Sequence, residues 1–443
     1  MLHSSTVNSQ PIRVLNWTMS SSLWQQLSSK RSTRVLVLHP LDRKNPEAIC
    51  ASLEEVNIDQ QPQFEAVSWT WGPEARQQRV YVDGQEILVR EHLHQFLLKL
   101  RGPEYERRLW VDALCINQQD PVEKSHQVAM MGEIFSSARK VLAWVGPEAD
   151  GSKEALRWLR EAAWKSRVDK IGIGVGPRQK ETARVLMAFL NRPWFGRTWI
   201  VQEVVLAKKV EIHCGSDMVK WDDLSKAAVS WRYNREESEG ESEASHFEAI
   251  APRLALLDER RRVYWWRDNY VTGEERGRSR DISDFVYHSR SFECSDPRDR
   301  IYALISLETN PSRVRLKPDY TLTLEQTLVS VFRQKQPDFV PDLDLLTGDP
   351  YLHSMARFTW KMAEALGFKD YEHVAGLLVE GIREGDKGVV WRGAAQEIRS
   401  GNVHDKQRAV SASSPKLPPL REIMLALGPG LADAIRDLGR GRG

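Results

Sequence analysis

Short apolar runs alternate with helical patterns along the first half of the chain. The apolar runs predict largely buried strands, and they lie at residues 34–38, 64–69, 108–116 and 141–146. Leu93, Phe96, Leu97 and Leu100 recur at helical spacing, and residues 152–164 carry a second helical pattern. Strands that alternate with helices predict an α/β fold, in which helices cover both faces of a parallel sheet.

Two local signals mark the ends of further elements. Asp83-Gly84 lies between the apolar stretches 79–82 and 86–89. This dipeptide tolerates the positive φ of a tight turn, so it predicts a β-hairpin inserted into the α/β pattern. Asp120-Pro121 supplies a capping residue and a first-turn proline, which predicts that a helix begins there.

The pattern changes further along the chain. Five glutamates lie among glycine and serine between residues 235 and 245, which predicts a solvated, charged linker or insertion. We expect the following division: an N-terminal arm at 1–30, an α/β domain at 31–216, the charged linker at 217–252, a mainly helical C-terminal region at 253–385 and a weakly structured tail at 386–443.

Composition narrows the class of partner. The 63 Lys and Arg against 61 Asp and Glu give a formal charge of +2, so no overall field recruits nucleic acid or an anionic membrane. No apolar run approaches the about 18 residues that span a bilayer, and no signal peptide is recognisable. We therefore expect a cytoplasmic protein without stable membrane insertion. The 4 cysteines form no CxxC pair, which argues against a disulfide framework and against a zinc ribbon.

Residues 192–203 bring together a carboxylate, two tryptophans and Arg197. Pro193 suits the first turn of a helix, and Glu203 interrupts the apolar pattern that begins at Trp199. Desolvation beside bulky rings and nearby cations shift the pKa of a carboxylate, which makes Glu203 the candidate catalytic residue. The alternative is that Glu203 pairs with Arg197 at the surface, while the tryptophans belong to the core.

Asp112 and Asn117 bracket the end of the predicted strand 108–116. Ligands of open α/β sheets bind beyond the carboxyl ends of the strands, so both side chains are candidates for contacting a ribose. The alternative is that Asp112 caps a turn and that Asn117 satisfies backbone groups. Cys115 has apolar neighbours on both sides and is expected to be a buried, inert thiol.

Three blocks of sequence together resemble a known family. They are Phe64-Glu65-Ala66-Val67-Ser68-Trp69-Thr70-Trp71-Gly72, the stretches 109–120, 130–135 and 141–146, and residues 192–203 continuing to Cys214-Gly215. In this order and spacing the chain resembles the heterokaryon incompatibility (HET) domain proteins of filamentous fungi, over roughly residues 30–216. Ser68-Trp69 stands where the family more often has a serine followed by a tyrosine.

This resemblance implies a role in non-self recognition and programmed cell death when unlike fungal strains fuse. It implies an incompatibility partner protein and a homo-oligomer formed on activation. HET domains have also been likened to Toll/interleukin-receptor (TIR) domains, whose fold is a flavodoxin-like parallel sheet flanked by helices. Some TIR domains cleave NAD, so the resemblance extends to an expected fold and to a candidate reaction.

In the TIR comparison, Glu203 stabilises the positive charge that develops on the ribose as nicotinamide departs. Trp71 or Trp199 stacks on the nicotinamide, and the planar fork of Arg197 holds a phosphate. No cofactor is required, because NAD is the substrate. The alternative is a non-catalytic signalling scaffold that acts through protein–protein interaction.

Overall fold

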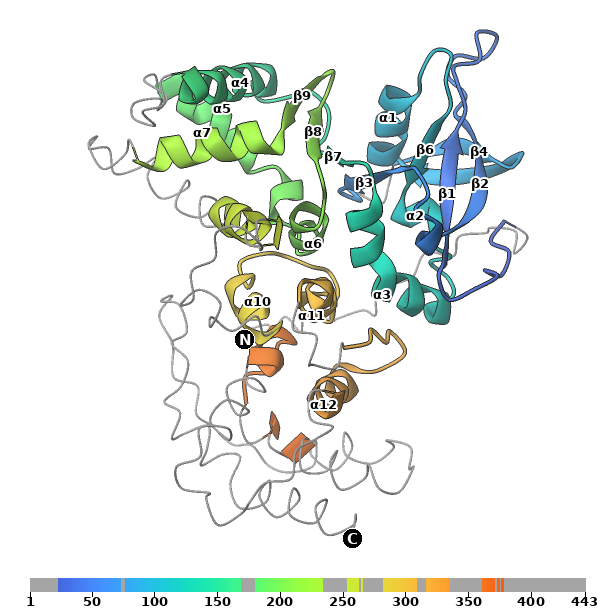
Figure 1. Cartoon of the computed structure of the whole chain (residues 1–443), viewed down its shortest axis with the longest axis vertical. Coiled ribbons are helices and arrows are strands. Elements are labelled where there is room, and N and C mark those ends of the chain that lie inside the picture. Colours follow the sequence, from blue (N-terminus) through green and yellow to red (C-terminus); the bar gives the residue numbers. More distant parts are fainter. Residues whose placement is uncertain are drawn as a thin grey trace, which may run out of the picture.

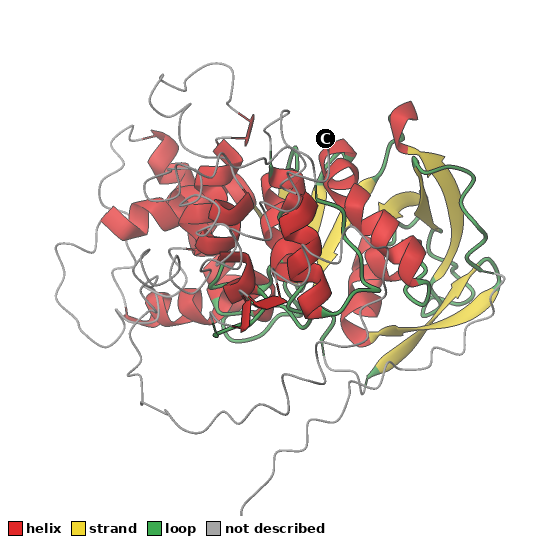
Figure 2. Cartoon of the chain, turned by 90° about the horizontal axis from the view of Figure 1, so that it is seen from below, coloured by secondary structure: helices red, strands yellow, loops and turns green. Residues whose placement is uncertain are grey.

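The structure is a computed structural model in which one mixed sheet is packed against helices (Figure 1). It describes the residues in the following ranges: 23–72, 76–168, 180–233, 253–262, 264–265, 282–308, 316–334, 361–370, 373–374 and 376–377. In the view from below, the strands gather at one side of the molecule and most of the helices at the other (Figure 2).

The described residues form a nine-stranded sheet in the order β5-β4-β2-β1-β6-β3-β7-β8-β9. The strands are β1 (Ser32–Leu38), β2 (Cys50–Asn57), β3 (Glu65–Trp69), β4 (Gln77–Val82), β5 (Gln85–Arg90), β6 (Arg107–Trp110), β7 (Val141–Trp144), β8 (Val210–Cys214) and β9 (Asp217–Lys220). Strands β6, β3, β7 and β8 are mutually parallel, whereas β1 and β9 flank them in antiparallel orientation. The α/β class is therefore confirmed, but the sheet is mixed rather than parallel throughout.

Helices follow the strands and then dominate the later part of the described chain. The α-helices are α1 (Glu91–Leu100), α2 (Asp112–Cys115), α3 (Pro121–Ser137), α4 (Ser152–Val168), α5 (Lys180–Leu190), α6 (Trp199–Val205), α7 (Trp221–Tyr233), α10 (Ile282–His288), α11 (Asp299–Tyr302) and α12 (Leu324–Gln334). The 3₁₀ turns are η1 (Ile58–Gln60), η2 (Pro193–Gly196) and η3 (Ile305–Leu307). Helices α4, α5 and α7 gather beside β8 and β9 in Figure 1.

Two predicted element ends are confirmed by the backbone. Asp83 and Gly84 join β4 to β5 with φ values of 49° and 74°, which is the positive-φ turn that the dipeptide predicted. Asp120 caps helix α3, where its side chain accepts hydrogen bonds from the backbone N–H groups of Val122 and Glu123.

The predicted strand 108–116 is wrong in its second half. Strand β6 ends at Trp110, and residues from Asp112 onward turn into the short helix α2. The Asp112 carboxylate accepts a hydrogen bond from the N–H of Ala113, and the N–H of Cys115 bonds to the carbonyl of Val111. These local bonds replace the strand ladder, because aspartate side chains compete readily for nearby backbone donors.

The helix expected from Pro193 begins six residues later than the proline suggested. Residues Pro193–Gly196 form the turn η2, and helix α6 starts at Trp199. Between them, Gly196 and Thr198 hydrogen-bond to the backbone of Glu293 instead of to helical partners. A contact with a distant segment therefore overrides the local helix signal.

The sheet alternates its side chains between two helical layers. Phe96 of α1 stacks on Trp144 of β7, with ring centroids 4.9 Å apart. Ser68 of β3 contacts Glu203 of α6. Every residue of β3 is buried, so this strand lies at the centre of the core. The candidate site lies at the carboxyl end of β3, where residues from both helical layers come close to the strand.

The sheet continues beyond residue 216, into the span expected to be a linker. Strand β9 pairs with β8, and Trp221 and Leu224 of α7 are buried in the core. The acidic run at 235–245 and the expected tail at 386–443 lie outside the described residues. Among the residues that are described, no helix has the length and apolar character needed to cross a membrane.

Candidate functional site

A buried polar cluster lies at the carboxyl end of β3. Ser68 Oγ donates a hydrogen bond to Glu203 Oε2, and it accepts one from Trp194 Nε1 at 2.7 Å. Ser68, Trp194 and Glu203 are respectively 1%, 0% and 4% exposed. The alternation of side chains along β3 turns Ser68 toward the α6 layer, where a buried hydroxyl needs partners for its donor and its acceptor.

Arg197 closes the cluster on its more exposed side. Its guanidinium donates to the carbonyl of Trp69, and Nη1 lies 4.0 Å from Glu203 Oε2. The Arg197 side chain is 18% exposed, against 5% for Glu203. The two residues therefore do pair, but Glu203 is a buried carboxylate rather than a member of a surface ion pair.

Burial dominates the ionisation of Glu203. Loss of hydration raises the pKa of its carboxyl above the ordinary value of 4.5, and the nearby charge of Asp112 acts in the same direction. Arg197 and the Ser68 hydroxyl favour the ionised form and oppose this shift. A carboxyl group whose proton affinity is raised by burial, beside one specific cation, is typical of functional sites.

Trp69 connects this cluster to residues on the other face of the sheet. Its indole Nε1 donates to Asp112 Oδ1 at 2.7 Å, and its ring stacks on Trp71 with centroids 5.5 Å apart and planes inclined by 13°. The guanidinium of Arg90 lies 5.1 Å from the centre of the Trp71 ring. Trp71 thus presents an aromatic face that already holds one cation.

The structure therefore brings together four of the six candidate residues. Glu203, Arg197, Asp112 and Trp71 all connect to the last two residues of β3. Asp112 also fulfils the structural alternative, because its carboxylate caps the turn at Ala113.

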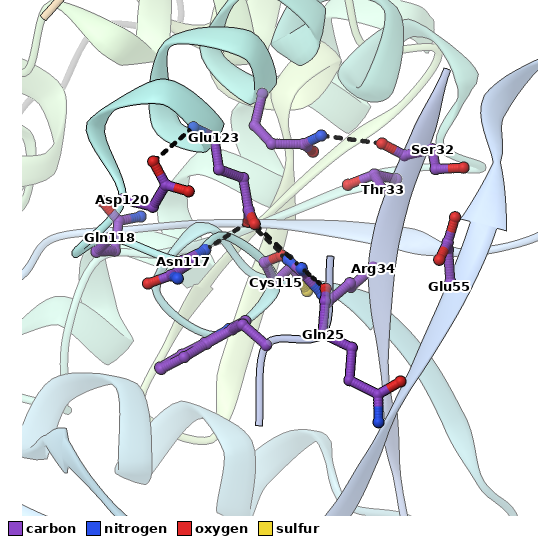
Figure 3. A network of polar contacts seen from close by, with 12 residues as sticks. Gln25, Ser32, Thr33, Arg34, Glu55, Cys115, Asn117, Gln118, Asp120 and Glu123 are labelled. Carbon is purple, nitrogen blue, oxygen red and sulfur yellow. Dashed lines mark hydrogen bonds and ion pairs between the residues drawn. The ribbon is translucent and has the colours of Figure 1, made fainter. Parts of the chain in front are cut away.

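Asn117 lies in a different network, at the start of α3 (Figure 3). Its N–H donates to Glu123 Oε1 at 2.8 Å, and its side chain accepts from the N–H of Gln119 at 3.2 Å. Glu123 in turn pairs with Arg34, whose Nη1 lies 2.6 Å from Glu123 Oε1. These contacts match the alternative in which Asn117 satisfies backbone groups.

Trp199 faces the downstream part of the chain. Its Nε1 donates to Asp299 Oδ2 at 3.0 Å, and the hydroxyl of Tyr320 donates to Asp299 Oδ1 at 2.7 Å. Of the two tryptophans expected to stack on a ligand, Trp71 stacks on Trp69, whereas the indole N–H of Trp199 is bonded to Asp299.

Cys115 adds no chemistry at this site. Burial raises the pKa of the Cys115 thiol to about 12, so the reactive thiolate is suppressed, as its apolar neighbours predicted. Within the described ranges, no group of three or more His, Cys, Asp or Glu side chains is arranged to hold a metal ion.

Sequence reasoning missed the roles of Ser68, Trp194 and Arg90. The signal for Ser68 was present, since it is a polar residue between the apolar residues Val67 and Trp69 of β3. Its partners were not predictable, because Trp194 and Glu203 reach it only through tertiary packing.

Known proteins match the part of the chain that contains this cluster. Residues 64–203 match the family model described as heterokaryon incompatibility protein (HET). The chain is also similar to heterokaryon incompatibility protein 6, OR allele, of Neurospora crassa, at 27% identity over 354 residues. That alignment covers 68% of this chain and 50% of the relative, so the chain spans about half the relative's length. No solved structure matches the chain.

The matched segment begins just before β3 and ends at Glu203, so it contains Ser68, Trp194, Arg197 and Glu203. The residues that converge on the end of β3 are thus part of the matched segment itself. The family that residues 64–203 of this chain match is the heterokaryon incompatibility (HET) family.

Proposed function

We propose that this protein acts in heterokaryon incompatibility, as a cell-death effector that responds to a partner protein. The observation that carries the proposal is the HET match over residues 64–203, whose two ends meet in the contact between Ser68 and Glu203. Similarity to a heterokaryon incompatibility protein along much of the chain supports the same role.

We further propose that the reaction is cleavage of NAD at the carboxyl edge of the sheet. The parallel strands, numbered by their order in the chain, stand in the order 2-1-3-4 (β6-β3-β7-β8). A flavodoxin-like sheet has the same order and binds its ligand where the order reverses, between its first and third strands. In this chain those strands are β3 and β7, and β3 carries the cluster around Ser68 and Trp69.

Four residues around Ser68 and Trp69 have a role in this reaction. The Glu203 carboxylate stabilises the positive charge on the ribose as the bond to nicotinamide breaks. Trp71 stacks on the nicotinamide ring after the guanidinium of Arg90 leaves its face, Arg197 pairs with a phosphate, and Asp112 contacts a ribose hydroxyl. Because Glu203 is only 4% exposed, the Ser68 contact must open before substrate reaches the carboxylate. Association with a partner or a second copy supplies that opening.

The second candidate function is a non-catalytic scaffold, and the burial of Glu203 favours it. A carboxylate that accepts from Ser68 and lies beside Arg197 also serves as a structural link between β3 and α6. In that case the same face recruits partner proteins, and no substrate enters.

Nicotinamide release from NAD distinguishes the two functions. The full chain is incubated with NAD under self-associating conditions, beside Glu203→Gln and a control, Glu211→Gln. Glu211 is a carboxylate of β8 that contacts Lys140 and His213 rather than Ser68. We expect release by wild type and Glu211→Gln, and its loss in Glu203→Gln. Absence of release by wild type, or equal release by Glu203→Gln, would rule out Glu203 as the catalytic residue and favour the scaffold.

A cellular assay addresses the same question independently of purification. Toxicity on expression should disappear in Glu203→Ala while folding and partner binding persist, if the carboxylate performs chemistry. Toxicity that persists in a folded Glu203→Ala protein supports the scaffold.

A further inference from the structure

Residues 293–299 form a segment that lies outside the HET match, and Glu293 in this segment holds the backbone around Arg197. The N–H of Thr198 donates to the carbonyl of Glu293 at 2.8 Å, and the N–H of Glu293 donates to the carbonyl of Gly196 at 2.6 Å. The two stretches of chain form an isolated parallel bridge between Arg197 and Glu293. The residue whose guanidinium lies next to Glu203 is therefore fixed between two hydrogen bonds to downstream backbone.

The same segment holds the first residue of helix α6. Asp299 accepts from the indole of Trp199 through Oδ2 and from the hydroxyl of Tyr320 through Oδ1. Trp199 and Glu203 are four positions apart in α6, so they share one side of that helix. The position of the Trp199 ring is thus linked to that of Glu203 through a single helical turn.

Tyr320 fastens this segment to α3, a second helix within the match. Its N–H donates to Ser125 Oγ at 3.1 Å, and the ammonium of Lys124 lies 4.6 Å from the centre of its ring. Arg298 adds two hydrogen bonds to nearby carbonyls, those of Tyr320 at 3.0 Å and Leu322 at 2.7 Å. Asp299 is therefore hydrogen-bonded to two side chains, those of Trp199 in α6 and of Tyr320, whose backbone is bonded to α3.

From these contacts we propose that Asp299 is a positioning residue for the Glu203 site. Through Trp199 it holds the start of α6 in the register that keeps Glu203 against Ser68 and Arg197 against Trp69. This inference rests on the proposed function only for its activity readout, and it extends that function by naming what controls the site. A partner that binds near Tyr320 and pulls on Asp299 releases α6, which is the opening that substrate access requires.

Asp296 provides a matched control for Asp299. It lies three residues earlier in the same segment and forms an ion pair with Arg298 at 2.6 Å, and its hydrogen bonds to Arg298 stay within that segment. If the carboxylates of this segment served only to stabilise it, loss of either one would have similar effects on α6.

Hydrogen exchange of the full chain tests the inference without any need for activity. We expect Asp299→Ala to speed amide exchange over residues 198–205 by at least about tenfold, which corresponds to loss of one hydrogen bond to a charged group. Trp199→Phe removes only the donor and should have the same effect, also in the case that Asp299→Ala fails to fold. Asp296→Ala should change exchange in this stretch by less than about twofold.

The conservative variant Asp299→Asn sharpens the test. Its amide oxygen can accept from Trp199, and its amide N–H can donate to the Tyr320 oxygen, so it should restore slow exchange. The double variant Asp299→Ala with Trp199→Phe should exchange no faster than either single variant. Equal acceleration by Asp296→Ala, or unchanged exchange in both Asp299→Ala and Trp199→Phe, overturns the proposal.

Kinetics of nicotinamide release then separate this inference from the proposed reaction. We expect Asp299→Ala to raise kcat by at least about tenfold under conditions that do not promote self-association, because release of α6 opens the Ser68 contact that keeps substrate from Glu203. Faster exchange in Asp299→Ala together with unchanged kcat overturns the positioning role. If wild type releases no nicotinamide while exchange behaves as expected, the proposed reaction fails, and control of α6 by Asp299 stands.

Discussion

Ser68 Oγ donates a hydrogen bond to Glu203 Oε2, and this contact joins strand β3 to helix α6 across 135 positions of the chain. The same hydroxyl accepts from the indole of Trp194. One small side chain therefore satisfies two buried polar groups that lie on the opposite layer. The stability of the site should depend on that hydroxyl far more than its size suggests.

Replacing Ser68 by alanine should destabilise the fold by about 1–3 kcal/mol, because the Trp194 N–H and the Glu203 carboxylate both lose a partner in a dry environment. Urea unfolding followed by circular dichroism measures the change. Ser136→Ala serves as the control, since the hydroxyl of Ser136 bonds to the carbonyl of Glu133 in its own helix. A Ser68→Ala protein as stable as Ser136→Ala would contradict the prediction.

Glu203→Gln should reveal the raised pKa of Glu203 as a pH-dependent difference in stability. The folded protein holds the Glu203 proton more tightly than the unfolded chain does. The stabilisation associated with this carboxyl is therefore fully present below about pH 4.5 and is lost as the pH rises through the folded-state pKa. We expect wild type to lose stability relative to Glu203→Gln as the pH rises, in an unfolding series from about pH 4 to about pH 8.

Glu211→Gln should show the opposite dependence. His213 and Lys140 hold the pKa of Glu211 down to about 2, below its ordinary value of 4.5. The advantage of wild type over Glu211→Gln should be complete above pH 4.5 and should vanish as the pH falls toward 2. A similar pH dependence in the two glutamine variants would refute the assignment of opposite shifts.

Arg34→Met should destabilise the protein by about 3–5 kcal/mol, because it leaves the Glu123 carboxylate without its counter-charge. The side chains of Arg34 and Glu123 are only 5% and 13% exposed, and their pair holds the start of α3 in Figure 3. Arg31→Met removes pairs with Asp59 and with Glu133, in which the side chains of all three residues are 39% to 57% exposed, so this variant should be destabilised far less. Chemical denaturation of the two variants under identical conditions tests this contrast.

Gly132→Ala should strain the contact between α3 and the turn η3. A Cβ atom at position 132 would overlap the side chain of Ser306. We expect a loss of about 1–3 kcal/mol, partly offset by the better helix propensity of alanine. Adding Ser306→Gly removes the overlapping side chain, so the double variant should recover most of the loss in thermal unfolding. A Gly132→Ala protein that is more stable than wild type would show that the two elements can separate without cost.

Local chemistry explains which features of the fold were predictable. The hairpin at Asp83-Gly84 and the start of α3 at Asp120 depend on neighbouring residues, and both were identified from sequence. Strand β2 was missed because its exposed positions include Glu54 and Glu55, which give no apolar alternation. The start of α6 was misplaced because Glu293, far along the chain, takes the hydrogen bonds that would extend the helix.

The candidate site was predictable to the same extent. Glu203, Arg197 and Trp71 were chosen because a carboxylate, a cation and an aromatic ring combine into recognisable chemistry. The convergence of these residues on Ser68 and Trp69 depends on how β3 is placed within the sheet. Neither spacing nor composition carries that information, whereas the register between β3 and β7 does.

The position of β3 within the sheet also governs how this region folds during synthesis. Strand β3 leaves the ribosome before β6 and β7, between which it finally lies, and Ser68 is made 135 positions before Glu203. Parallel strands that are distant in sequence pair slowly, since the entropy of the intervening loop is lost before the contacts form. If the ribosome pauses between these two residues, the apolar strand β3 is exposed without its neighbouring strands. The nascent chain is then open to mispairing and to capture by chaperones.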